Sequence, residues 1–181
     1  MRAVLRAANF AAVHHSAQRR KGAHQEPYIN HLLEVAELIA DAVEEADENV
    51  IMAALLHDTV EDTMVTREDL VREFGEDVAS LVSEVTDDKS LPKQERKRLQ
   101  VEHAAHKTLR AQLIKIADKI SNLRSILYQP PPDWSRQRKR EYFDWAKQVV
   151  DRLPNANAKL KKEFERTYQL FEDLVPPEGA N

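Results

Sequence analysis

Two adjacent pairs of ionisable residues have the types and the spacing to bind a metal ion. His57 and Asp58 stand together, and Glu61 and Asp62 follow four positions later. In a helix this spacing places Glu61 one turn beyond His57 and Asp62 one turn beyond Asp58, so the four side chains form two neighbouring polar ridges. Burying so many charges is costly without a partner, and a divalent cation is a common partner. A helix end that is exposed to solvent would explain the same residues equally well.

Two further polar residues lie among apolar neighbours. His31 stands beside the apolar stripe of an expected helix, and Asp118 interrupts the apolar run IKIADKI. Either residue alone is more often a hydrogen-bonded structural group than a metal ligand. Together with His57 and Asp58 they provide two imidazoles and two carboxylates from three helices, a ligand set that suits a divalent ion such as Mn²⁺. The sequence therefore predicts a metal site between helices.

The elements that position these residues are all expected to be helices. Apolar residues recur at helical intervals almost from end to end, and alternating runs of β-branched residues are scarce. One helix is expected to begin near Asn49 and to continue through the His-Asp pair, and another to span about Leu109 to Leu127. The segment from Gly22 to Pro27 reads as a loop. We therefore expect an all-α fold, a helical bundle.

Length and composition fit one soluble domain. The chain has 181 residues, of which 42% are apolar, and these can bury a single core. We expect one domain at 1–181, with its core at about 1–150 and a C-terminal helix at about 154–175. The sequence contains no cysteine, which excludes disulfides and a thiol nucleophile and makes the cytoplasm the expected compartment. No apolar run approaches the roughly 20 residues that span a bilayer, so no membrane partner is expected.

The charge balance narrows the partners further. The formal net charge is −4, whereas proteins that bind nucleic acids usually carry a positive excess. We therefore expect no nucleic-acid partner. Only three glycines occur, too few for a glycine-rich phosphate loop, so a bound phosphate must be held by metal, side chains or helix N-termini.

Longer motifs around the candidate residues point to a known family. These motifs are RRKG at Arg19 to Gly22, PYINH at Pro27 to His31, AALLHDTVEDT at Ala53 to Thr63, EVTDDKSLPKQERKRLQ at Glu84 to Gln100, IADKISNLR at Ile116 to Arg124 and WSRQRKREYFDWAKQVV at Trp134 to Val150. An isolated His, a His-Asp pair and a distant Asp resemble the pattern of the HD-domain phosphohydrolases. The longer motifs resemble the hydrolase domain of RelA/SpoT proteins, most closely the stand-alone small alarmone hydrolases of the metazoan SpoT-homologue type.

This resemblance implies a function and a set of site residues. The function is Mn²⁺-dependent removal of the 3′-pyrophosphate from ppGpp and pppGpp, which gives GDP or GTP and pyrophosphate. One Mn²⁺ ion would be bound by His31, His57, Asp58 and Asp118, and Glu61 and Asp62 match the acidic pair assigned to catalysis. The matching nucleotide-binding positions are Arg20, Lys21, Asn122, Arg124, Arg138 and Tyr142.

Other interpretations stay open at this point. The chain could be a phosphatase that acts on another phosphorylated nucleotide such as NADPH, or a catalytically silent module that binds an alarmone or a protein. The presence of the whole ligand set and the acidic pair disfavours the silent module. The oligomeric state is open. The basic run from Lys93 to Arg98 is interpreted as a solvated, salt-bridged face, and His14 and His15 receive no role.

Overall fold

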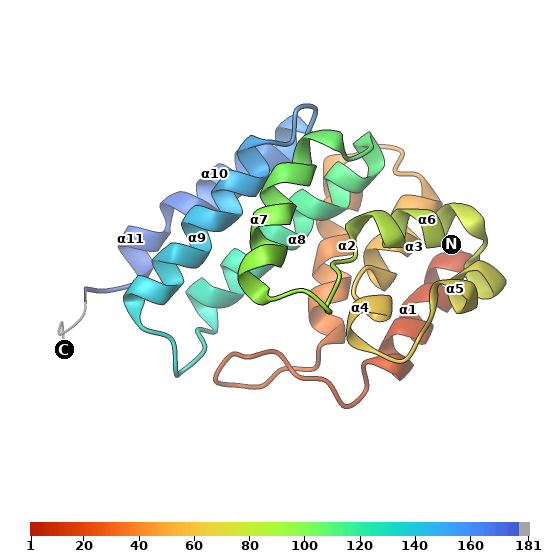
Figure 1. Ribbon diagram of the computed structural model, residues 1–181, viewed down its shortest axis with the longest axis horizontal. Helices are drawn as coiled ribbons and strands as arrows, with labels where there is room; N and C mark the ends of the chain where they lie inside the picture. The colour runs from red at the N-terminus through yellow and green to blue at the C-terminus, as the bar shows by residue number, and fades with distance from the viewer. Residues whose placement is uncertain (178–181) are drawn as a thin grey trace.

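Helix α8 (Leu109–Tyr128) lies at the centre of the structure and packs against helices from both ends of the chain (Figure 1). The computed structural model describes residues 1–177, so positions 178–181 of the domain expected at 1–181 lie outside the described residues. Within residues 1–177 the secondary structure is helical, with no β-strand and one isolated antiparallel bridge between Arg19 and Pro27. The expected all-α class is confirmed.

The described residues form eleven α-helices and one 3-10 turn, η1 (Ala104–His106). The helices before α8 are α1 (Arg2–His14), α2 (Ile29–Ala42), α3 (Glu48–Leu56), α4 (Thr59–Asp62), α5 (Arg67–Phe74), α6 (Glu76–Val85) and α7 (Lys93–His103). Those after it are α9 (Arg136–Asp151), α10 (Ala158–Gln169) and α11 (Phe171–Leu174). None of the helices in the described range is both long enough and apolar enough to cross a membrane.

The two sides of α8 belong to two hydrophobic cores. Ile114 and Ala117 pack with buried side chains of α1, α2, α3, α5 and α6. Ile116, Ile120 and Leu123 pack with buried side chains of α9, α10 and α11. A helix that is apolar on both sides is a buried helix, and here it joins the two cores. We propose on this ground that the described helices fold as one unit.

The helix expected to run through the His-Asp pair is broken at that pair. Helix α3 ends at Leu56 and α4 begins at Thr59, so His57 and Asp58 stand in the turn between them. Nδ1 of His57 lies 2.8 Å from the carbonyl oxygen of Ala54, an acceptor that in a continuous helix pairs with the backbone N–H of Asp58. The side chain of His57 thus competes with the helix, and the apolar pattern alone does not reveal this.

The single C-terminal helix expected at about 154–175 is divided into α10 and α11. Helix α10 begins only after Asn157, whose side chain accepts hydrogen bonds from the backbone N–H groups of Lys159 and Leu160. Because Asn157 satisfies the first free N–H groups, the helix begins there rather than at Pro154. Helix α11 follows as a separate turn.

Residues 15–28 connect α1 to α2, and the loop at 19–27 within them is closed at its base by backbone hydrogen bonds. The amide nitrogen of Arg20 lies 2.9 Å from the carbonyl oxygen of Glu26, and that of Tyr28 lies 3.1 Å from the carbonyl oxygen of Gln18. These bonds fix both ends of the loop.

Gly22 allows this loop to lie against the end of α8. A Cβ atom at Gly22 would stand 2.4 Å from the carbonyl oxygen of Gln129 and 2.9 Å from its Cβ atom. We expect Gly22→Ala to push the loop away from α8 and to lower the free energy of unfolding by about 1–3 kcal/mol. Urea unfolding measures the change, with Ala23→Ser at the exposed neighbouring position as the control. Equal unfolding midpoints for wild type and Gly22→Ala would contradict the expectation.

Candidate active site

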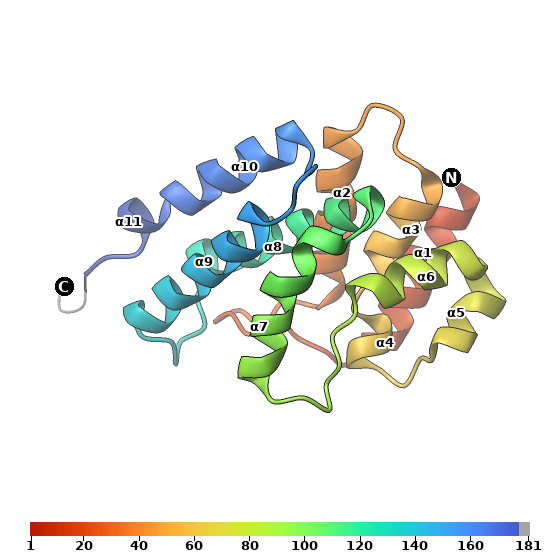
Figure 2. The same ribbon diagram turned by 45° about the horizontal axis from the view of Figure 1, so that its top comes forward.

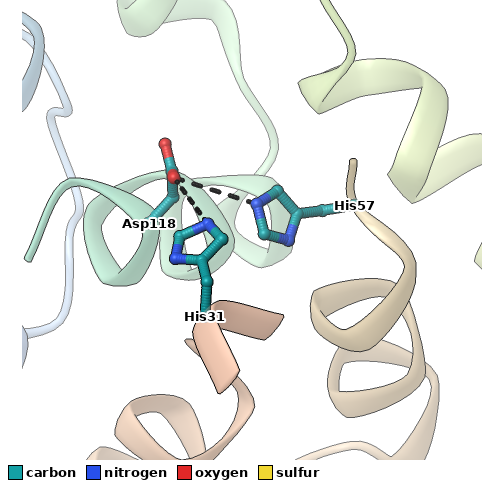
Figure 3. A group of neighbouring side chains, drawn as sticks. All are labelled: His31, His57 and Asp118. Carbon is teal, nitrogen blue, oxygen red and sulfur yellow. Dashed lines mark ion pairs between the residues drawn. The ribbon is translucent and has the colours of Figure 1, made fainter. Parts of the chain in front are cut away.

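Three helices bring two histidines and an aspartate together in the interior. His31 lies in the first turn of α2, His57 directly follows α3, and Asp118 lies in the middle of α8 (Figure 3). All three residues are buried, and one potential ligand atom from each lies within 4.8 Å of the others. Oδ1 of Asp118 is 3.4 Å from Nε2 of His31 and 3.8 Å from Nε2 of His57. The chain thus holds a buried group that could bind a metal ion.

Asp58 faces the same two imidazoles. Its Oδ2 atom lies 3.6 Å from Nε2 of His31 and 3.3 Å from Nε2 of His57. The hydroxyl of Tyr28 donates a hydrogen bond of 2.6 Å to this carboxylate. Asp58 and Asp118, two of the ligands that the family resemblance implies, therefore both face Nε2 of His31 and His57, and the group whose ligand atoms lie within 4.8 Å of one another is His31, His57 and Asp118.

In His31 and His57, the hydrogen bond made by Nδ1 determines which ring nitrogen carries the hydrogen atom. The carbonyl of Ala54 can only accept, so His57 donates from Nδ1, at 2.8 Å. The hydroxyl of Ser121 donates to Glu34 at 2.6 Å, so it accepts from Nδ1 of His31 at 2.8 Å. Both rings therefore direct the lone pair of Nε2 toward the carboxylates, as is typical of metal-binding histidines.

These Nε2 atoms have no hydrogen-bond partner within the described residues. Both atoms, on His31 and on His57, are buried. Buried polar atoms are normally paired, and lone pairs that face carboxylate oxygens repel them unless a positive charge lies between. Imidazole nitrogens and carboxylate oxygens are the donors that a divalent transition metal accepts. The donor set therefore fits a divalent metal ion.

The same carboxylates also attract a proton to the cluster. Burial lowers the pKa of His57, but the charges of Asp58 and Asp118 outweigh burial and raise it to about 10. Burial raises the pKa of Asp58, but the charge on His57 outweighs this effect and holds it below its usual range. Burial keeps the pKa of His31 low. A proton and a metal ion thus compete for Nε2 of His57.

Glu61 and Asp62 lie on α4, beside the cluster. Oε2 of Glu61 accepts a hydrogen bond of 3.1 Å from the backbone N–H of Asp87. Burial raises the pKa of Glu61 and outweighs this hydrogen bond. Oδ2 of Asp62 accepts from the side-chain amide of Gln18 at 2.8 Å, and its other oxygen pairs with Lys89. The two carboxyl groups therefore sit in different environments.

A cavity of about 340 Å³ adjoins Asp62 and contains four of the six expected nucleotide-binding residues, namely Arg20, Lys21, Asn122 and Tyr142. Arg20 lies 3.1 Å from the side-chain oxygen of Asn122, and its guanidinium carbon lies over the ring of Tyr28, 5.6 Å from the ring centre. The ring of Trp134 forms another wall. The cavity therefore combines flat aromatic surfaces with positive charge.

The two remaining expected nucleotide-binding residues, Arg138 and Arg124, do not line this cavity. The guanidinium group of Arg138 lies 4.4 Å from the centre of the Trp134 ring, at the edge of the cavity. Arg124 lines a neighbouring cavity of about 420 Å³ instead, together with Arg20 and His31, and its guanidinium group pairs there with Glu34 at 2.9 Å and Glu163 at 2.8 Å. Helical periodicity places Arg124 on another side of α8 from Asn122, and there it ties α8 to α2 and α10.

Sequence reasoning missed part of the site on α7, which packs beside α9 (Figure 2). The run from Lys93 to Arg98 is a solvated, salt-bridged face as expected, since α7 has no buried residue and Arg98 pairs with Glu95 and Glu102. The same helix also reaches the site: slight burial and the charges of Arg138 and Lys21 lower the pKa of Lys93. Arg96 lies 3.7 Å from Oε1 of Glu61. The alternating charges of this run are typical of a surface helix, so they do not predict a position beside the site. Only the family motif that contains the run could have indicated it.

The comparisons with known proteins cover nearly the whole chain. The HD domain family model matches residues 7–147. The guanosine-3′,5′-bis(diphosphate) 3′-pyrophosphohydrolase MESH1 of Xenopus tropicalis is 50% identical over 165 residues, which are 91% of this chain and 92% of that protein. MESH1 of Homo sapiens is 48% identical over 166 residues, which are 92% of this chain and 93% of that protein.

A solved structure agrees with these relatives. It is described as a metazoan ortholog of SpoT that hydrolyses ppGpp, and it matches with a TM-score of 0.89 and 47% sequence identity. The match covers 92% of this chain and 94% of that chain. The buried histidines and carboxylates described above lie within the matched HD domain, and the chain belongs to the HD domain family, among the MESH1 proteins.

Proposed function

We propose that this chain is a Mn²⁺-dependent hydrolase that removes the 3′-pyrophosphate from ppGpp and pppGpp and leaves GDP or GTP. The observation that carries the proposal is the buried cluster around the unpaired Nε2 atoms of His31 and His57, next to a cavity with cationic and aromatic walls. Relatives that share about half of the sequence bear the name of this activity. We also place the enzyme in the cytoplasm, which suits a chain without cysteine.

The proposed metal ligands are His31, His57, Asp58 and Asp118. Mixed nitrogen and oxygen donors without sulfur suit Mn²⁺ among the divalent ions. An ion bound there supplies positive charge to a phosphoryl oxygen and lowers the pKa of a water molecule. Tyr28, which lines the cavity, keeps Asp58 in place by donating a hydrogen bond to its carboxylate.

Glu61 and Asp62 are the proposed catalytic residues. Hydrolysis breaks the bond between phosphorus and the 3′-oxygen of the ribose, and that oxygen must gain a proton. Glu61 is suited to supply it, since burial raises its pKa and so favours its protonated form. Asp62, which Gln18 and Lys89 hold in place, is suited to orient the attacking water and accept its proton.

The cavity residues are the proposed nucleotide contacts. A cavity of about 340 Å³ falls within the range of small-molecule sites, about 300–1,000 Å³. The guanidinium group of Arg20 can stack on a purine base, as it does now on Tyr28. Lys21, Arg138 and Lys93 provide positive charge for phosphates at the rim.

The first experiment follows pyrophosphate release from ppGpp by metal-stripped protein with and without Mn²⁺. We expect release only with Mn²⁺, a loss of about 10²- to 10⁴-fold in kcat for Glu61→Gln with Mn²⁺ binding retained, and weaker Mn²⁺ binding for Asp58→Asn. Glu68→Gln, on the exposed face of α5, is the control. No release by folded wild type with Mn²⁺ bound would refute alarmone hydrolysis, and the same assay with NADPH would then test the alternative substrate.

A second prediction concerns pH. The metal ion must displace the proton from Nε2 of His57, whose pKa is raised to about 10, so acid favours the proton and alkali favours the metal. We expect the apparent Mn²⁺ affinity to rise by about tenfold per pH unit from about pH 6 to about pH 8, with one proton released per ion. Calorimetric titration in buffers of different ionisation enthalpy measures both quantities. Asp58→Asn should show a shallower slope, and an affinity independent of pH would contradict the competition.

A third prediction separates Arg20 from Arg124. Arg20→Met should raise the KM for ppGpp by about tenfold, because a stacking cation contributes on the order of 0.5–2 kcal/mol, and should leave Mn²⁺ affinity unchanged. Arg124→Met should leave KM unchanged and lower the melting temperature, because its charge partners are Glu34 and Glu163. Steady-state kinetics and thermal unfolding distinguish them. An equal rise of KM in both variants would place Arg124 at the substrate.

A further inference from the structure

His15 is a buried histidine outside the metal cluster, and it is tied to the site by hydrogen bonds. It stands directly after α1 and is 2% exposed. Its Nδ1 atom lies 2.6 Å from the side-chain oxygen of Gln18, whereas its Nε2 atom is buried without a hydrogen-bond partner among the described residues. A buried polar side chain with one specific partner calls for an explanation.

The direction of the hydrogen bonds along this chain is fixed from its far end. The carboxylate of Asp62 accepts, so the group of Gln18 that lies 2.8 Å from it is the amide nitrogen. The amide oxygen of Gln18 then faces His15, and it can only accept. His15 must therefore donate from Nδ1. His15 therefore donates to Gln18, and Gln18 donates to Asp62, which lies 44 positions later in the sequence.

His15 also supports a second arm of the site. Its ring stacks on the ring of Tyr28, with 5.1 Å between centroids and 22° between planes. The hydroxyl of Tyr28 donates to Asp58 at 2.6 Å. The backbone joins the two arms, since the N–H of Tyr28 donates to the carbonyl of Gln18 at 3.1 Å. One buried ring therefore contacts the residues that hold both Asp62 and Asp58.

We propose that His15 and Gln18 are positioning residues for the hydrolysis, an inference that rests on the proposed function. Without a donor at His15, only the bond to Asp62 holds the amide of Gln18, and the amide can rotate away from that carboxylate. Nδ1–H of His15 prevents this rotation. It thereby keeps an N–H donor on Oδ2 of Asp62 and holds that carboxylate in the orientation that catalysis requires.

The kinetic test compares two substitutions of His15. In His15→Asn the side-chain amide nitrogen takes the place of Nδ1, and in His15→Phe the ring and its stacking on Tyr28 remain but the donor is lost. We expect His15→Phe to lower kcat by about tenfold with KM and Mn²⁺ affinity unchanged, and His15→Asn to stay close to wild type. Unchanged kcat in His15→Phe, or equal losses in both variants, would overturn the proposal in favour of plain packing.

A second readout does not depend on activity. Nitrogen-15 NMR of the histidine rings identifies which nitrogen carries hydrogen. We expect His15 to carry it on Nδ1 in wild type and to lose this preference in Gln18→Met. Hydrogen on Nε2 in wild type would overturn the relay. If wild type releases no pyrophosphate from ppGpp, the proposed function fails, and the NMR result still decides whether the relay exists.

Discussion

Two imidazole lone pairs and two carboxylates must face one another inside a helical core, and the surrounding structure is arranged to make this possible. Each imidazole is held from behind, His57 by the carbonyl of Ala54 and His31 by the hydroxyl of Ser121. The cluster then needs positive charge at its centre, either a proton or a divalent ion. The fit of the donor set to a metal follows from this electrostatic requirement.

Helix α8 is where this requirement is most demanding, because the helix buries the charged residues Asp118 and Lys119 between two hydrophobic cores. Asp118 is paired with its neighbour Lys119 at 3.0 Å and accepts from Asn122 at 2.6 Å. The ammonium group of Lys119 also lies 4.5 Å from the ring centre of Trp145 on α9. A carboxylate and an indole face thus offset the cost of burying this lysine. The same contacts connect the candidate metal cluster to the helix that bears Arg138 and Tyr142.

The sequence predicted those features that local patterns encode. Polar residues within apolar helices, such as His31 and Asp118, identified where a buried site forms. The break at His57 was not predictable, because the helical pattern continues through it, whereas the side chain of His57 bonds to the carbonyl of Ala54. The ion pairs of Arg124 were not predictable for a related reason, since its partner Glu163 lies 39 residues away and no local pattern indicates that pairing. Where the spacing of residues leaves the role of a side chain open, its partners from distant parts of the sequence determine that role.

In the proposed function, the loop at 19–27 connects nucleotide binding to the candidate metal cluster. Gln18 precedes it and holds Asp62, and Tyr28 follows it and holds Asp58. The loop itself carries Arg20, whose guanidinium group rests on Tyr28. A nucleotide that draws Arg20 toward its base therefore acts on a segment whose two ends are attached to site carboxylates. Because loop and cluster share these bonds, a bound substrate and a bound metal ion should each restrict the motion of the same residues, so that each favours binding of the other.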